Sequence, residues 1–209
     1  GSVRWLWNHC LALTNETYKQ TGKGLSRFDL QKRLPELKKQ EELEWLKNTY
    51  SQCLQVVCLN LSRAFINFFE RRASYPRFKS KHGKQAISYP QKVKINGDLI
   101  SFPKIGEIYA KIHRPIEGSI KTVTITKNKC NQYYASVTFE DGKEAPEISN
   151  EGKAIGLDMG LNDFCVTSDG SKFTNPKWLK KHECNLKIKQ QSLSRKRKDS
   201  NNRNKARLK

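Results

Sequence analysis

The hydrophobic periodicity of the chain changes near residue 73, and this change sets the fold class. Before it, between about Glu44 and Arg71, apolar residues recur at steps of three and four and define one buried helical stripe. After it, residues 86–140 contain short segments in which apolar and polar residues alternate, as in half-buried strands. The pattern predicts an α+β chain.

Local signals divide the helical part, residues 3–72. An apolar-rich stretch predicts a helix from Val3 to about Tyr18, broken by glycines at 22 and 24. Ser26 starts a second helix, with Asp29 three residues later as a capping box. Pro35 should end or kink this second helix. The clearest helix is predicted to run without a break from Glu44 to Arg71.

The β part is predicted to be a small antiparallel barrel. Asn96-Gly97 separates two apolar segments, which is a strong hairpin signal. Further strands are expected at 107–113, 119–127 and 132–139, and short strands joined by tight turns favour a barrel. The polar segment from Asp141 to Gly152 is interpreted as a linker.

Residues 154–173 predict a separate antiparallel meander. Asp158 lies centrally on its first strand, between Gly156 and Gly160. Beyond it, Leu179, Leu186 and Leu193 follow a heptad spacing, so part of the C-terminal stretch is expected to be helical.

The chain carries 40 Lys and Arg against 20 Asp and Glu, a formal net charge of +20. Such an excess points to a polyanion partner, and nucleic acid is the first candidate. The alternatives are a membrane surface, a merely basic surface, and a ribosome-associated or structural role. Because no long apolar run or signal peptide is visible, we expect a soluble, intracellular protein without a membrane partner.

Basic residues concentrate in two segments. Residues 71–85 hold six Lys or Arg and no acid, with Tyr75 and Phe78 among them. Cations contact phosphates and aromatic rings stack on bases, so we interpret the loop 73–85 as a binding loop, the alternative being a solvated basic loop. Residues 171–209 hold 14 Lys or Arg against Glu183 and Asp199.

Asp158 is the candidate catalytic residue. An aspartate at the centre of a β-meander, flanked by glycines, is how RNase-H-like nucleases place their first metal ligand, and two Mg²⁺ ions there activate a water at a phosphodiester. The alternative is an ordinary aspartate at a turn, as we interpret Asp163 and Asp169. The six cysteines show no C-x-x-C spacing, and no nucleophile triad, P-loop or dinucleotide fingerprint is visible.

Several stretches, in order, resemble the TnpB family of transposon-encoded RNA-guided nucleases (the OrfB transposases). Residues 3–8 resemble its R-x-x-W-N opening, and residues 75–81 its P-R-F-K-S-K loop. The other matching stretches are residues 59–69 (L-x-x-A-F-x-x-F-F), 113–118 (H-R-P-I-E-G), 155–161 (the first RuvC motif), 175–179 and 203–208. The resemblance covers nearly the whole chain.

The resemblance implies an architecture and a function. Residues 3–72 would be a helical recognition lobe, 73–85 a basic loop, 86–145 the wedge-domain barrel, and 154–209 the N-terminal part of an RNase-H-like (RuvC) nuclease domain with a basic helical tail. The partners would be a guide RNA and target DNA, with no small-molecule substrate, in a prokaryotic cytoplasm at the nucleoid. Expected nucleic-acid contacts are Tyr75, Arg77, Phe78, Lys79, Lys81, Lys84, Gln85, His113, Arg114, Lys180, Lys181, Arg195, Lys196 and Arg197, with Asp158 as catalytic residue and metal ligand.

The chain also departs from the family pattern. The strand expected before Val3, the second and third RuvC carboxylate motifs and the zinc ribbon are not in the sequence. We therefore expect a truncated chain that binds nucleic acid without cutting it, with Mg²⁺ only in the complete site and zinc only in the missing C-terminal part. The alternative is a stand-alone DNA- or RNA-binding protein, or repressor, derived from the same family.

Overall fold

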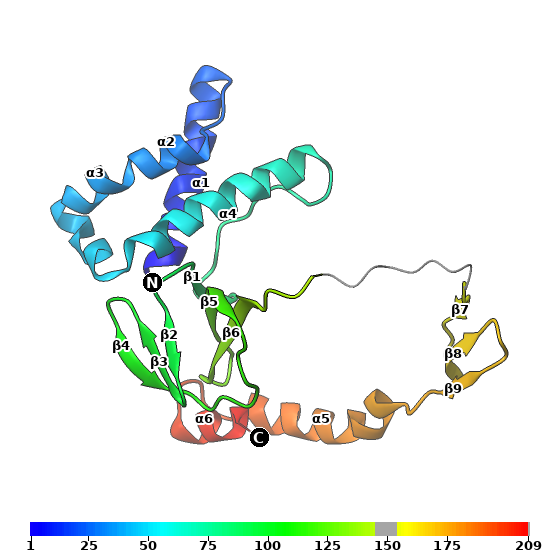
Figure 1. Ribbon diagram of the computed structural model, residues 1–209. Coiled ribbons are helices and arrows are strands. Elements are labelled where there is room, and N and C mark those ends of the chain that lie inside the picture. Colours follow the sequence, from blue (N-terminus) through cyan, green and yellow to red (C-terminus); the bar gives the residue numbers. More distant parts are fainter. Residues whose placement is uncertain (145–153, 209) are drawn as a thin grey trace. The chain divides into compact units, whose positions relative to one another are not determined.

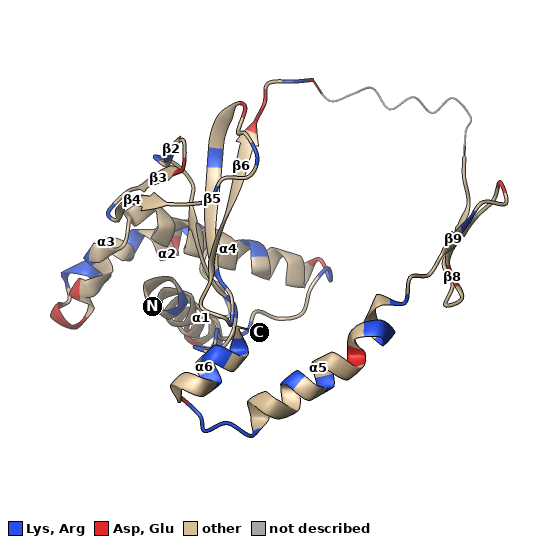
Figure 2. Cartoon of the chain, turned by 90° about the horizontal axis from the view of Figure 1, so that it is seen from below, with Lys and Arg blue, Asp and Glu red and all other residues tan. Residues whose placement is uncertain are grey.

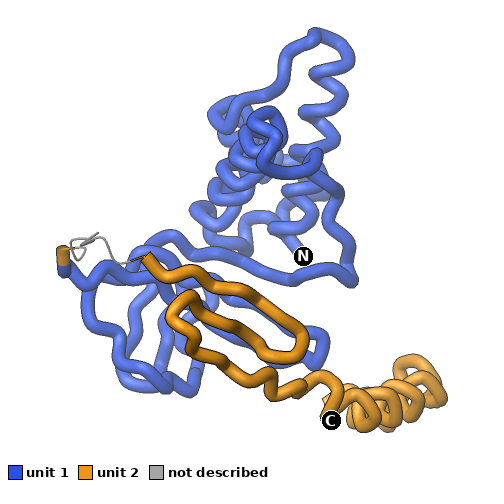
Figure 3. The backbone as a smooth tube through the Cα atoms, turned by 90° about the vertical axis from the view of Figure 1, so that its right-hand side faces the viewer, with its two compact units in different colours: residues 1–143 blue, residues 144–209 orange. Residues whose placement is uncertain are grey.

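A computed structural model describes residues 1–144 and 154–208 (Figure 1). The chain divides into two compact units, residues 1–143 and residues 144–209 (Figure 3). Helices and small antiparallel sheets make up the described residues, which confirms the α+β fold class. Most of the predicted linker, residues 145–152, lies outside the described part.

The first helix, α1 (Ser2–Thr21), ends where the glycines predict. Gly22 adopts φ 69°, and its amide donates to the carbonyl of Tyr18 at 2.8 Å. A left-handed residue after the last turn is a common helix end, and glycine adopts it without steric cost.

Two short helices follow, α2 (Arg27–Lys32) and α3 (Leu34–Lys39). The capping box at Ser26 and Asp29 is confirmed, since the Ser26 side chain accepts from the Asp29 amide and the Asp29 side chain from the Ser26 amide. Pro35 lies in the first turn of α3, where a missing backbone N–H costs nothing. The helix that starts after Ser26 ends at Lys32, before Pro35, in agreement with the prediction.

The prediction of one helix from Glu44 to Arg71 is wrong. The 3₁₀ helix η1 (Glu41–Asn48) comes first, Thr49 and Tyr50 are extended, and α4 (Ser51–Phe69) begins after them. Leu46 on η1 is fully buried together with Leu54 and Leu61 of α4. Periodicity alone could not reveal the break because the apolar stripe continues in phase across it.

The helices enclose one core, and α4 also touches a second. Leu6 and Leu11 of α1 pack with Leu46, Leu54 and Leu61 in the first core. The second core is built from the buried side chains of Cys53, Tyr89, Val93, Ile100, Phe102 and Val123. Cys53 comes from α4 and the rest from the β part, so α4 joins the helical and β parts of the first unit.

The β part consists of two antiparallel sheets. One has the order β1 (Gln85–Tyr89), β5 (Ser119–Lys127), β6 (Tyr133–Glu140), and the other has the order β2 (Lys94–Asn96), β3 (Leu99–Phe102), β4 (Gly106–Tyr109). The predicted hairpin at Asn96-Gly97 is confirmed by the pairing of β2 with β3.

The prediction of a closed barrel is not met in the described residues, where the two sheets are not hydrogen-bonded to each other. Strands β2, β3 and β4 are only three or four residues long. Strands that short leave too little length for the tilted seam of a closed barrel.

The second unit contains the predicted meander and two helices. Strands β7 (Leu157–Asp158), β8 (Asp163–Thr167) and β9 (Lys172–Thr174) form an antiparallel sheet, followed by α5 (Trp178–Ser194) and α6 (Asn201–Arg207). Among its described residues only Cys165 and Thr167 are buried. Leu179, Leu186 and Leu193 all lie on α5, which confirms the predicted helix. None of the residues of α5 is buried.

Candidate nucleic-acid interface

The basic loop between α4 and β1 is held along α1 by side chains. Trp7 Nε1 donates to the carbonyl of Arg77 at 3.0 Å. Asn8 Nδ2 donates to the carbonyl of Lys79 at 3.0 Å, and Asn8 Oδ1 accepts from the Lys79 amide at 2.7 Å. The loop is thus a fixed segment of the first unit rather than a freely solvated one.

Tyr75 anchors the start of this loop. Its hydroxyl donates to Asn15 Oδ1 at 2.6 Å, and its ring meets those of Phe65 and Phe68 edge-on, at centroid distances of 5.6 and 5.1 Å. Pro76 beside it is buried. Tyr75, proposed from the sequence as a stacking residue, makes these contacts with its own chain and is still 44 % exposed.

The next basic side chains differ from one another. The Lys79 ammonium lies 3.7 Å from the centroid of the Trp7 ring, and burial lowers the pKa of this lysine. Arg77 is exposed, and Phe78, between the two anchored residues, is 59 % exposed. Arg77, Phe78 and Lys79 are all exposed, but the Lys79 ammonium faces an aromatic ring of its own chain.

The end of the loop is shaped by Gln85. Its Nε2 donates to the carbonyls of Lys81 at 2.9 Å and Gly83 at 3.1 Å, so this amide closes the turn before β1. Lys81 and Lys84 are exposed. The ion pairs found among the described residues join Glu44 to Lys47, Glu70 to Arg72, and Glu140 to Lys121. None of them neutralises Arg77, Lys81 or Lys84.

His113 and Arg114 lie on the connection between β4 and β5, and both are exposed. No hydrogen bond or ion pair within the described chain joins them to the basic loop. They remain a separate candidate contact on the same unit.

Asp158 lies on β7 opposite Val166 of β8 and is exposed. Two hydrogen bonds connect Gly156, before β7, to Ser168, after β8. The Gly156 amide donates to Ser168 Oγ at 3.0 Å, and the Gly156 carbonyl accepts from the Ser168 amide at 2.9 Å. Gly160 approaches the chain closely, since a Cβ there would lie 3.0 Å from the Asp163 carbonyl. The backbone places the carboxylate on an open edge of the sheet.

Asp169 forms the turn between β8 and β9, as predicted. Its carboxylate accepts from the Thr167 hydroxyl and from the Ser171 amide. These hydrogen bonds, that of Thr167 above all, lower the pKa of Asp169.

The described residues do not fit a two-magnesium centre. Across residues 1–144 and 154–208, no three His, Cys, Asp or Glu side chains converge on a point where they could hold a metal. Two metals sharing a phosphodiester need several carboxylates, and here Asp158 stands alone.

The basic tail is a pair of helices rich in Lys and Arg (Figure 2). Lys180 and Lys181 are exposed in the first turn of α5, and the Lys181 ammonium lies 5.3 Å from the Trp178 ring centroid. In the turn after α5, Arg195 and Arg197 are exposed and Lys196 is half-buried. These side chains carry the candidate phosphate contacts of the second unit.

Arg203 has a structural role that the sequence did not reveal. Its guanidinium donates to the carbonyls of Leu193 and Lys196, both at 2.9 Å. It therefore satisfies carbonyls at the end of α5 and fixes α6 against it, as cationic side chains near helix C-termini can.

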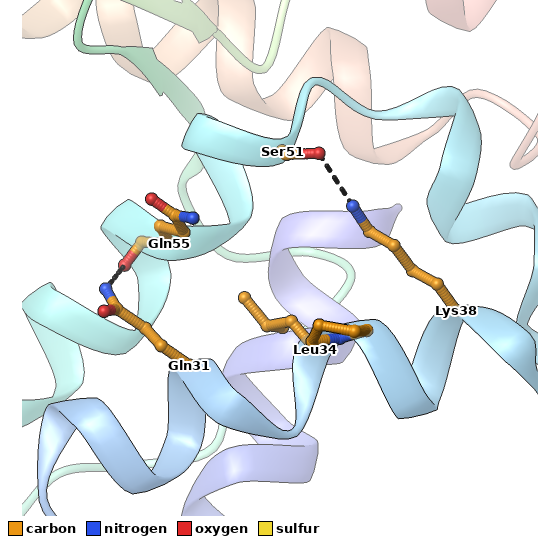
Figure 4. Close-up of a pocket in the computed structure, with 6 residues that line it drawn as sticks. Gln31, Leu34, Lys38, Ser51 and Gln55 are labelled. Carbon is orange, nitrogen blue, oxygen red and sulfur yellow. Dashed lines mark hydrogen bonds between the residues drawn. The ribbon is translucent and has the colours of Figure 1, made fainter.

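A hollow of about 250 Å³ lies between α2, α3 and α4 (Figure 4). Gln31 Nε2 donates to the carbonyl of Gln55 at 3.3 Å, and Lys38 Nζ donates to Ser51 Oγ at 2.8 Å, with Leu34 between the two bridges. Burial and the neighbouring Lys104 lower the pKa of Lys38. The bridges tie α2 and α3 to α4, and we interpret the hollow as part of the helical packing.

Comparison with known proteins identifies the family. Residues 134–209, which span β6, the meander and the basic tail, match the OrfB_IS605 family model, described as a probable transposase. "Putative RNA-guided DNA endonuclease InsQ" of Escherichia coli K12 is 34 % identical over 204 residues, 97 % of this chain and 50 % of that protein. The chain belongs to the OrfB_IS605 family.

This chain is also similar to two further proteins. A "Putative RNA-guided DNA endonuclease" of Streptomyces pristinaespiralis is 33 % identical over 215 residues, all of this chain and 53 % of that protein. "Virulence protein VsdF" of Salmonella dublin is 34 % identical over 93 residues, 40 % of this chain and 78 % of that protein. The chain spans about half the length of the two endonuclease relatives.

Among the described residues, no helix combines the length and apolar character needed to cross a membrane.

Proposed function

We propose that this OrfB_IS605 chain is the nucleic-acid-binding part of an RNA-guided DNA endonuclease. It binds a guide RNA and target DNA, with residues 3–72 as recognition lobe, residues 86–145 as wedge domain and residues 154–209 as the start of a RuvC nuclease domain. The alignment of 97 % of the chain with a relative of that printed name carries the proposal.

The charges of the two units support nucleic acid as the partner. The chain has a net charge of +20, and the ion pairs found within the described residues involve Lys47, Arg72 and Lys121 but none of the candidate contact residues. Exposed cations release condensed counterions from nucleic acid when they meet phosphates, which drives binding. Arg77, Lys81 and Lys84 in the first unit, and Arg195 and Arg197 in the second, meet this requirement.

Asp158 is the proposed first carboxylate of a metal-dependent nuclease site. In the whole protein, further carboxylates would join Asp158 to hold Mg²⁺, which would supply the chemistry of phosphodiester cleavage. This chain supplies one carboxylate on an exposed sheet edge. Alone, it binds without cutting.

A salt series tests the proposal. The chain is titrated with a short mixed-sequence DNA duplex and with a structured RNA, magnesium is present throughout, and the products are examined for strand breaks. We expect tight, salt-dependent binding to the RNA and no cleavage. Magnesium-dependent cutting that disappears in Asp158→Ala would show that the chain completes a nuclease site and would overturn this part of the proposal.

A stand-alone nucleic-acid-binding protein is the second candidate, and the isolation of Asp158 among the described residues favours it. Its signature is specific binding to a DNA duplex with no dependence on RNA. A longer reading frame carrying the remaining carboxylate motifs would remove this candidate.

A further inference from the structure

Two sequence motifs that lie about 70 positions apart are in direct contact in the structure. Trp7 and Asn8 belong to the stretch at 3–8, and Arg77 and Lys79 belong to the stretch at 75–81. Three hydrogen bonds and the ring contact of Lys79 with Trp7 connect them. The packing of hydrophobic cores does not explain these polar contacts, which are directed at one short piece of backbone.

We propose that Trp7 and Asn8 are positioning residues that hold the basic loop in its binding conformation, and that the exposed Lys79 side chain keeps its ammonium on the Trp7 ring instead of on nucleic-acid phosphate. This inference rests on the proposed function. It separates the basic residues of the loop into one that orders the loop and three that face the partner, Arg77, Lys81 and Lys84.

The role of Asn8 follows from the hydrogen bonds of the loop backbone. In the described chain, residues 74–79 make no backbone–backbone hydrogen bond. One carboxamide, that of Asn8, satisfies both the N–H and the C=O of Lys79, as a neighbouring strand would. The indole of Trp7 satisfies Arg77. Without these side chains the loop would have to be ordered at the moment of binding, at an entropic cost.

The role of Lys79 follows from its surroundings. Its ammonium lies 3.7 Å from the Trp7 ring centroid, a favourable cation–π distance, and both sides of its peptide are fixed by Asn8. Reaching a phosphate would require the side chain to leave the ring. Lys79, Arg77, Lys81 and Lys84 are all exposed and take part in none of the ion pairs found within the described residues. The ring contact alone distinguishes Lys79, so the other three cations can meet phosphates without first leaving a partner of their own chain.

The slope of log affinity against log salt reports how many cations touch phosphate, and it separates these roles. Lys79→Met removes the charge and keeps an aliphatic chain over Trp7, and Lys81→Met is its matched control on the same loop. With a short mixed-sequence DNA duplex as probe, we expect Lys81→Met to make the slope shallower by about 0.9 and Lys79→Met to leave it unchanged. Equal slope changes in both variants would overturn the assignment of Lys79.

Asn8→Ala tests the positioning role, with Gln20→Ala as the control for removal of an exposed carboxamide from the same helix. We expect about tenfold weaker binding in Asn8→Ala at an unchanged salt slope, because the cations still reach phosphate and only the ordering cost is added. Gln20→Ala should bind as the original chain does. Unchanged affinity in Asn8→Ala would reduce Asn8 to a merely structural residue and overturn the inference.

Amide hydrogen exchange gives a readout that needs no nucleic acid. In Asn8→Ala the Lys79 amide should exchange faster while amides in α4 keep their protection. If the original chain fails to bind duplex or RNA, the proposed function fails. If it binds but Lys79 exchange and affinity are unaffected by Asn8→Ala, only this inference fails.

Discussion

The two units differ in how they bury their apolar side chains. The first unit encloses two cores, with Leu6, Leu54 and Val123 inaccessible to solvent. In the described part of the second unit only Cys165 and Thr167 are buried, and Leu161 is 89 % exposed. The stability of the first unit therefore comes from packing, and the order of the second from turns and hydrogen bonds.

This difference separates two ways of presenting positive charge. The first unit presents Arg77, Lys81 and Lys84 on a loop fixed to a packed helix. The second presents its cations on α5, on α6 and on the turn between them, and these two helices have no buried residue and are tied together by Arg203. Substitutions matched between the units test whether this contrast is real.

The largest effect is expected from Gly118→Ala in the first unit. Gly118 has φ +132°, and a Cβ there would lie 2.1 Å from the Glu140 carbonyl oxygen, a backbone atom that cannot move aside easily. We expect the free energy of unfolding to fall by about 4 kcal/mol or more, measured by urea denaturation. Gly170→Ala in the second unit is the control. Its φ of +88° also strains an alanine, but no atom beyond its chain neighbours lies within 4 Å of the added Cβ. It should cost about 1–2 kcal/mol, and equal destabilisation by the two substitutions would contradict the contrast.

Truncation of leucines comes next. Leu54 is fully buried in the helical core, whereas Leu186 on α5 is 48 % exposed. Leu54→Ala should lower the free energy of unfolding by about 2–5 kcal/mol, and Leu186→Ala should change it by about 0.5 kcal/mol or less. A large destabilisation by Leu186→Ala would mean that α5 is packed in solution.

Helix caps give a smaller effect. Ser26 caps α2 in the first unit and Ser200 caps α6 in the second. Ser26→Ala should lower the global free energy of unfolding by about 1 kcal/mol. Ser200→Ala should instead speed amide exchange within α6 and leave the denaturation curve of the first unit unchanged. A shift of that curve by Ser200→Ala would show that the two units unfold cooperatively, and would contradict their separation.

The smallest effects concern two exposed carboxylates. The Ser26 hydroxyl lowers the pKa of Asp29, and the Thr167 hydroxyl lowers the pKa of Asp169, from an ordinary value of 3.8. A lowered carboxylate pKa stabilises the fold above the ordinary value, and this stabilisation is lost as the pH falls through the lowered pKa. In NMR titrations, Ser26→Ala and Thr167→Val should each raise the midpoint of their own partner alone. Unchanged midpoints would show that these hydrogen bonds do not form in solution.

Local signals predicted much of the fold. Gly22 ends α1, Ser26 caps α2, and Asn96-Gly97 turns the hairpin, because each acts through its immediate neighbours. The break at Tyr50 was missed since the apolar stripe stays in phase across it. The barrel prediction failed because strand closure depends on pairing between distant segments, which alternation does not encode.

The candidate site was predictable only in part. The basic composition of residues 73–85 is visible in the sequence, but the bond from Asn8 to Lys79 joins residues 71 positions apart. Lys79 therefore had the same appearance as Lys81 until the fold placed it over Trp7. Arg203 was likewise hidden among the other cations of the tail.

The salt dependence of DNA-duplex binding, measured for the original chain and two triple variants, tests most directly whether the exposed cations bind nucleic acid. One variant changes Arg77, Lys81 and Lys84 to Gln, and the other changes the exposed Arg195 and Arg197, together with the half-buried Lys196 between them, to Gln. We predict a steep slope for the original chain and a shallower slope in both variants, by about 0.9 for each cation that no longer meets a phosphate. A slope near zero in the original chain, or one that neither variant alters, would contradict the claim that these exposed cations bind nucleic acid.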